Sequence, residues 1–190
     1  MSRDNKTALI TGSGQNIGRG IANQLALAGF NIIVNGSRNQ GAAEEAAAEV
    51  RTRGVEALVA MGNVGIKTEA EAVAKAGLDH FGRIDVLVNS AAIRPHEPFL
   101  EMSNDAWQKV IDVDMNAAIW LSKAVLPSMI ENGWGRIISF SGMNAQRGYL
   151  GAAAVSVAKH GVWGLTKALA VEFGSKGITA NIISPGTFPP

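Results

Sequence analysis

One segment near the start of the chain restricts the possible fold more than any other. The apolar run from Thr7 to Ile10 is followed by a glycine-rich turn, TGSGQNIG, and then directly by a helix-length stretch that ends at Ala28. In such a turn Gly12 permits a sharp bend after the strand, and Gly18 permits close packing of the helix. Backbone amides at the start of a helix attract phosphate groups. The segment therefore predicts a strand, a turn and a helix that hold the pyrophosphate of a nicotinamide dinucleotide.

Strand-length and helix-length segments alternate along the whole chain. The short apolar runs are nearly continuous, which is typical of parallel strands that are covered on both faces. Gly29, Gly54 and Gly177 each follow a helix-length stretch, where a left-handed residue commonly ends a helix. The expected strands are 7–11, 31–35, 55–61, 85–89, 136–140 and 178–183, and the expected helices are 17–28, 41–53, 67–81, 104–132 and 153–176.

This alternation predicts one domain over residues 1–190 with a three-layer, doubly wound α/β fold of the Rossmann type. Right-handed crossovers would place helices on both faces of a mostly parallel sheet of about six strands. A chain of 190 residues with 47% hydrophobic residues can bury about 70% of the surface that its unfolded form exposes. One well-packed domain is therefore expected, and two domains are not.

Composition argues against several other classes of protein. The formal net charge is +1 and the charged residues are scattered, so neither nucleic acid nor an anionic membrane is expected as a partner. No apolar stretch approaches the ~20 residues of a membrane span. The N-terminus also lacks the apolar core of a signal peptide, so the cytoplasm is the default location. The chain has no cysteine and its histidines lack the spacing of metal ligands, so no metal site is predicted.

Ordered signals along the whole chain resemble the short-chain dehydrogenase/reductase family. They are the glycine-rich turn with Thr11, Gly12 and Gly18, the segment Asn89-Ser90-Ala91-Ala92, a closely similar helix over 156–172 with Lys159, and Pro185-Gly186 after the sixth strand. Members of this family transfer a hydride between a nicotinamide dinucleotide and a carbonyl or alcohol substrate. The resemblance therefore implies an NAD(P)-binding protein of the oxidoreductase class.

The resemblance also implies a set of cofactor-binding residues. Asn16 stands where the family's middle glycine normally lies, and asparagine tolerates a left-handed backbone better than most residues, so we expect the turn to persist. In the family, residues that match Asn63 lie by the adenine ring, and residues that match Asn89 line the nucleotide. The expected set is Gly12, Asn16, Ile17, Gly18, Ser37, Arg38, Asn63, Val64, Asn89, Ala91, Lys159, Pro185 and Gly186.

The end of the second expected strand favours NADP over NAD. NAD sites of this type usually carry an acidic residue there, which accepts hydrogen bonds from the ribose 2′-hydroxyl. Here the sequence reads Asn35-Gly36-Ser37-Arg38, and no acidic residue appears before Glu44. Arg38 can pair with a 2′-phosphate through charge-assisted hydrogen bonds. The alternative is that Arg38 is a solvated loop residue.

Three of the four groups that the family uses for proton transfer are absent. In the family a tyrosine exchanges the proton, with a lysine four residues later, a serine thirteen residues earlier and an asparagine on the preceding long helix. Residues four apart share a helix face, so the register can be counted from Lys159. Val155 then stands at the tyrosine position and Gly142 at the serine position, and the asparagine position is Asp114.

The residues that remain leave the function open. Lys159 can still hydrogen-bond the nicotinamide ribose, as the family's lysine does. Tyr149 and Ser141 are the only candidate substitutes for the missing groups, because an Asp114 carboxylate beside Lys159 is expected to stay ionised in an ion pair. The chain is therefore an oxidoreductase with a displaced proton donor, a catalytically silent dinucleotide-binding or partner subunit, or a degenerate protein that binds no dinucleotide well.

Two further expectations concern surfaces that this chain would leave uncovered. In the family a substrate-covering loop, a helix and a seventh strand follow the Pro-Gly segment, and this chain lacks most of that part, so its sixth strand is expected to be an edge. The helices expected from Asn104 to Asn132 and from Ala153 to Lys176 are apolar nearly all round, and family members pair them across a dimer. We therefore expect a homo-oligomer through these helices. The alternative is that loops of the same chain cover these faces.

Overall fold

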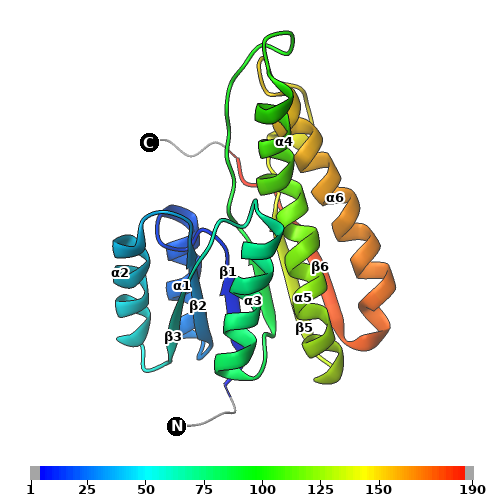
Figure 1. The fold of residues 1–190 in the computed structure, drawn as a ribbon. Coiled ribbons are helices and arrows are strands. Elements are labelled where there is room, and N and C mark those ends of the chain that lie inside the picture. Colours follow the sequence, from blue (N-terminus) through cyan, green and yellow to red (C-terminus); the bar gives the residue numbers. More distant parts are fainter. Residues whose placement is uncertain (1–4, 187–190) are drawn as a thin grey trace.

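Six parallel strands form one sheet in the computed structural model, which describes residues 5–186 (Figure 1). The strands are β1 (Thr7–Ile10), β2 (Asn31–Gly36), β3 (Ala57–Met61), β4 (Val86–Asn89), β5 (Gly135–Phe140) and β6 (Ile178–Ile183). Their order is β3-β2-β1-β4-β5-β6, so the direction of winding reverses between β1 and β4 and β6 is an edge strand. Such a reversal opens a crevice at the carboxyl ends of the strands, where ligands bind in this class of fold.

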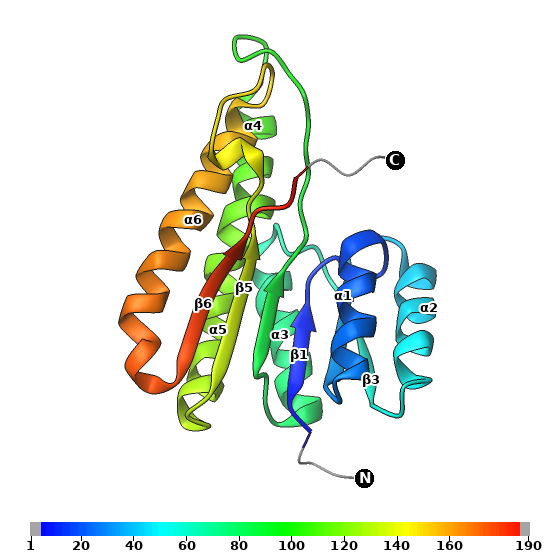
Figure 2. The same ribbon diagram turned by 180° about the vertical axis from the view of Figure 1, so that it is seen from behind.

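Helices cover both faces of this sheet, which confirms the expected three-layer α/β fold (Figures 1 and 2). One face packs against α1 (Asn16–Leu27) and α2 (Gln40–Arg51), and the other packs against α3 (Lys67–Phe81), α5 (Ala117–Glu131) and α6 (Ala153–Phe173). The glycines that follow helices, Gly29, Gly54 and Gly177, have positive φ values as expected. Within residues 5–186 no helix is long and apolar enough to cross a membrane.

The expectation of one continuous α-helix from Asn104 to Asn132 is wrong. The chain forms α4 (Asn104–Ile111), then a π-helical turn (Asp112–Asn116), and then α5. A π turn inserts one residue into the helical ladder, and such turns are frequent at functional sites. This one contains the buried Asp114, whose carboxylate accepts a hydrogen bond from the Ile93 N–H at 2.8 Å. Helical periodicity in the sequence gives no sign of the inserted residue.

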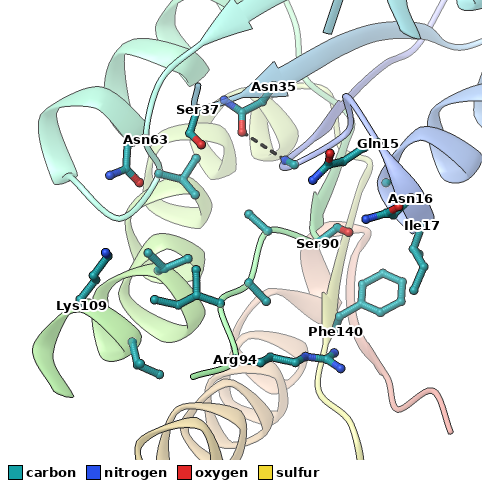
Figure 3. A pocket seen from close by; sticks show the side chains of 18 of the residues that line it. Gln15, Asn16, Ile17, Asn35, Ser37, Asn63, Ser90, Arg94, Lys109 and Phe140 are labelled. Atoms are coloured by element: carbon teal, nitrogen blue, oxygen red, sulfur yellow. Dashed lines mark hydrogen bonds between the residues drawn. The ribbon is translucent and has the colours of Figure 1, made fainter. Parts of the chain in front are cut away.

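The buried side chain of Asn35, at the end of β2, joins the glycine-rich turn to two strand ends. Its Oδ1 accepts a hydrogen bond from the Gly12 N–H at 3.2 Å (dashed line in Figure 3). Its Nδ2 donates to the carbonyl oxygens of Ala60 and Gly62 at 3.0 and 3.1 Å. The Asn35 backbone N–H also donates to Ser13 Oγ at 3.0 Å. These bonds fix the turn relative to β2 and β3.

Replacing Asn35 by alanine is expected to lower the free energy of unfolding by about 2–3 kcal/mol, because the buried carbonyl oxygen of Ala60 and the partly buried Gly12 N–H lose their hydrogen bonds. Asn181→Ala is the matched control. Asn181 is exposed and donates only to Thr179 Oγ1, so we expect its loss to cost less than about 0.5 kcal/mol. Urea denaturation measures both values, and equal effects would contradict the role assigned to Asn35.

Candidate functional site

Asn16 holds the glycine-rich turn in a left-handed conformation. Its φ is +50°, and it is the one non-glycine residue with a positive φ among residues 5–186. This confirms that asparagine takes over the backbone conformation for which glycine is the usual residue. The departure from the family's glycine pattern therefore leaves the path of the turn intact.

The turn brings the N-terminus of α1 to the carboxyl edge of the sheet. A Cβ atom on Gly18 would lie 2.6 Å from the Gly12 carbonyl oxygen, so only glycine lets the helix start this close to the turn. No side chain caps α1, and its first turn contains no acidic residue. The first amides of the helix are therefore available to an anion, and the helix dipole favours negative charge there.

A cleft of about 770 Å³ opens beside this helix terminus (Figure 3). The structure brings most of the expected cofactor residues together around it, namely Gly12, Asn16, Ile17, Gly18, Ser37, Arg38, Asn63, Val64, Ala91, Lys159 and Pro185. Asn89 lies beneath the cleft instead, where it lines a small cavity and its Nδ2 donates to Ser139 Oγ at 3.2 Å. Gly186 is not among the lining residues.

Sequence reasoning missed several other residues that line the cleft. They include Gln15, Asn35, Ser90, Ile93, Arg94, Pro95, Lys109, Val113 and Phe140. The residues at strand ends could have been found, because Asn35, Ser90 and Phe140 stand at the ends of parallel strands that meet at one edge. Lys109 on α4 and Arg94 in the segment after β4 carry no comparable signal, since their placement depends on how that segment packs.

Among residues 5–186, every charged residue that lines the cleft is basic. These residues are Arg38, Arg94, Lys109 and Lys159. Lys159 forms an ion pair with Asp114, whereas the other three form none with any side chain of residues 5–186. A concave surface with one sign of charge concentrates the field and attracts ligands of the opposite sign. The cleft is therefore suited to an anionic ligand.

Lys159 and Asp114 form a buried pair at the inner end of the cleft. Lys159 Nζ lies 3.1 Å from Asp114 Oδ2, and the two side chains are 4% and 0% exposed. The expected ion pair is thus present. Burial raises the pKa of the Asp114 carboxyl, and the charges of Lys159 and Arg94 oppose that rise only in part. The pKa of Asp114 is therefore raised, whereas the lysine alone would lower it.

The tyrosine and serine positions offer no hydroxyl group to the cleft. Val155 is 3% exposed and packs in an apolar cluster with Val110, Ala154 and Ala158. Gly142 has φ 132° and ψ 179°, a conformation that residues with a Cβ rarely adopt. Neither residue is among those that line the cleft. The backbone at Gly142 is therefore shaped for glycine and would resist a serine.

Gly142→Ser is expected to lower the free energy of unfolding by about 1–3 kcal/mol because of this backbone conformation. A Cβ would meet no atom within 4 Å at Gly142, so the cost is conformational and not steric. Gly148→Ser is the matched control, since Gly148 is exposed, has open space around it and has no positive φ. Urea denaturation should show a change within about 0.5 kcal/mol for the control. A Gly142→Ser variant that is as stable as the control would contradict the claim that a residue with a Cβ is strained at this position.

The two candidate substitutes also lie outside the cleft lining. Arg147 Nε donates a hydrogen bond to Tyr149 Oη at 2.8 Å, and the guanidinium also lies over the tyrosine ring. Ser141 is buried directly after β5, and its Oγ has no hydrogen-bond partner. Neither hydroxyl is therefore placed to act on a ligand in the cleft.

The histidines do not contribute to the site. None of them lines the cleft, and His96 and His160 direct ring nitrogens toward the backbone carbonyl oxygens of Leu150 and Ser156. Among residues 5–186 no three potential metal-ligating side chains lie together.

The parallel sheet, the glycine-rich turn at its switch point and the basic cleft define the class of dinucleotide-binding α/β proteins. The family model described as short chain dehydrogenase matches residues 6–189. The chain is 38% identical to a 3-oxoacyl-(acyl-carrier-protein) reductase of Synechocystis sp., over 95% of this chain and 73% of that protein. It is 37% identical to the acetoacetyl-CoA reductase of Allochromatium vinosum, over 95% of this chain and 74% of that protein. The chain belongs to the short-chain dehydrogenase family, whose members are NAD(P)-dependent oxidoreductases.

Solved structures agree with this assignment. The acetoin dehydrogenase of Salmonella typhimurium superimposes with a TM-score of 0.93 at 30% identity, covering 96% of this chain and 73% of that chain. An NAD+-bound xylitol dehydrogenase superimposes with a TM-score of 0.90 at 32% identity, covering 97% of this chain and 71% of that chain.

Proposed function

We propose that the cleft binds NADP(H), with the pyrophosphate at the N-terminus of α1. The observation that carries this proposal is the charge of the lining, in which all four charged residues are basic. Arg38 stands two residues after the end of β2, where a 2′-phosphate would lie, and no carboxylate of residues 5–186 lines the cleft to repel that phosphate. Gly18 and the uncapped first turn of α1 fit the pyrophosphate, because a Cβ on Gly18 would collide with the turn.

Other lining residues fit the rest of the dinucleotide. Asn63 and Val64 line the cleft and would hold the adenine ring, and Ala91 lines it as well. Lys159 is fixed by Asp114 at that inner end and would hydrogen-bond the nicotinamide ribose. The bound dinucleotide supplies a hydride donor or acceptor, and the protein contributes its position and its electrostatic surroundings.

The same proposal holds that the chain has lost the family's proton-transfer route. Val155 is buried in an apolar cluster, Gly142 carries no side chain, and Tyr149 lies outside the cleft lining with its hydroxyl bonded to Arg147. Removal of a general acid typically slows a reaction by about 10² to 10⁴, and removal of an oxyanion donor by about 10² to 10³. We therefore infer a dinucleotide-binding protein that turns over carbonyl or alcohol substrates very slowly or not at all.

We further propose that the protein works in the cytoplasm. We also propose that two copies pair through α4–α5 and α6. Apolar side chains on these helices are exposed in one copy, with Ile130 37%, Val157 48% and Val171 86% accessible. A second copy would cover these side chains, because isologous pairing of the same surface is the commonest arrangement in soluble oligomers.

A thermal-shift titration with NADPH and NADH tests the binding proposal. We expect both to raise the melting temperature and NADPH to do so at a lower concentration. Arg38→Gln is expected to weaken NADPH binding about tenfold and to leave NADH binding unchanged, because only the 2′-phosphate pairs with Arg38. Arg53→Gln is the matched control, since Arg53 is an exposed arginine beyond the other end of α2.

Dinucleotide binding and the NADP preference can fail separately in this titration, and an assay of NADPH oxidation tests the loss of proton transfer. If neither dinucleotide shifts the melting temperature at millimolar concentration, the binding proposal is wrong. An Arg38→Gln variant with unchanged NADPH affinity would overturn the NADP preference alone. Oxidation of NADPH with a panel of carbonyl compounds at rates usual for enzymes, about 1–10³ s⁻¹, would overturn the loss of proton transfer.

A further inference from the structure

Arg94 is a cation in the cleft that the proposed dinucleotide site does not use. Its side chain lines the cleft and is exposed, and it forms no hydrogen bond or ion pair with any side chain of residues 5–186. A guanidinium group presents five N–H donors in a fixed planar arrangement that matches a carboxylate or a phosphate. All of these donors are therefore available to a ligand.

Arg94 lines the cleft on the segment that is bonded to the buried pair. Its charge is close enough to Asp114 to act on that carboxyl, and its neighbour Ile93 is bonded to Asp114 through the backbone. Figure 3 shows Arg94 at the end of the cleft that holds Phe140, whereas Lys109 lies at the end that holds Asn63. The phosphates of the dinucleotide are assigned to Arg38 and to α1, so Arg94 faces the nicotinamide position.

The backbone that carries Arg94 is held in place. The Ile93 N–H donates to Asp114 Oδ1 at 2.8 Å, and the Ile93 side chain packs against the apolar cluster that contains Val110 and Val155. Pro95 follows directly, and its ring fixes the backbone φ angle there. The base of the Arg94 side chain is therefore positioned in advance, which lowers the entropy cost of binding a ligand.

The cleft lining near Arg94 contains apolar groups, and the nearby Asp114 carboxyl is buried and paired with Lys159. Ile17, Phe140, Pro95 and Pro185 line the cleft, and no acidic side chain does. The hydroxyl groups that would bind a neutral carbonyl in the family are absent at Val155 and Gly142. Recognition of a second ligand at this end therefore depends on charge at Arg94 and on apolar contact.

We propose that Arg94 binds the carboxylate or phosphate group of a second, small ligand that sits beside the nicotinamide position. This inference rests on the proposed function for the placement of the nicotinamide, but the anion site itself depends only on residues of this chain. The ligand class is a small anionic carbonyl compound, such as a 2-oxo acid, or its phosphorylated counterpart. Bidentate pairing with a guanidinium gives the recognition both strength and direction.

Calorimetric titration of the protein in low salt, first saturated with NADP+ and then without it, tests this proposal. The probes are pyruvate, its neutral analogue pyruvamide, and inorganic phosphate. We expect pyruvate or phosphate to bind and pyruvamide to bind at least tenfold more weakly. Arg94→Gln is expected to weaken binding of the anion at least tenfold, and Arg53→Gln is expected to bind it as the unmodified protein does. The affinity of Arg94→Lys is expected to lie between those of Arg94→Gln and the unmodified protein.

The arms of the experiment separate the possible failures. If pyruvate binds and phosphate does not, Arg94 recognises a carboxylate. If phosphate binds and pyruvate does not, Arg94 recognises a phosphate group. Equal binding of pyruvate and pyruvamide, no binding of either anion, or unchanged binding in Arg94→Gln would overturn the proposal. If NADP+ itself does not bind, the proposed function fails, while the titrations without NADP+ still decide whether Arg94 holds an anion. Arg94 is exposed, so an unchanged melting temperature verifies that the variants are folded.

Discussion

The buried amide of Asn35 is the interaction on which the rest of the site depends. It lies on β2, beside β1, and it bonds the glycine-rich turn to the ends of β2 and β3. Because the turn is held there, α1 must start at the carboxyl edge of the sheet, and Gly18 allows that start to lie against Gly12. The helix terminus, the basic lining and the apolar walls of the cleft all follow from this arrangement.

The inner end of the cleft has been built differently from its family pattern. A carboxyl group at Asp114 neutralises Lys159, and the same carboxyl holds the segment that carries Arg94. Breaking such a buried pair would leave an uncompensated charge, so the two residues are expected to be retained or lost together. Val155 fills an apolar cluster instead of presenting a hydroxyl group. We therefore propose that the cleft combines a binding surface with an inner end that recognises charge and no longer transfers protons.

Sequence reasoning predicted the fold and much of the cleft because local rules decide them. The apolar runs identified all six strands, and the tolerance of asparagine for positive φ predicted Asn16 correctly. The π turn at 112–116 was missed because α5 is apolar on nearly all sides, so that the shift of one residue leaves no mark in its apolar pattern. Arg94 and the glycine-specific backbone at Gly142 were missed because they depend on packing between segments far apart in the chain.

The central claim is that a nicotinamide dinucleotide places its pyrophosphate on the first turn of α1. Backbone amide signals in ¹H–¹⁵N spectra, recorded while NADP+ is added, test it most directly. We expect large, saturable shifts for the amides of Asn16, Ile17 and Gly18, and none for Val171, which lies on the exposed far part of α6. Binding of NADP+ that leaves these first-turn amides unmoved, or spectra unchanged at millimolar NADP+, would contradict the account.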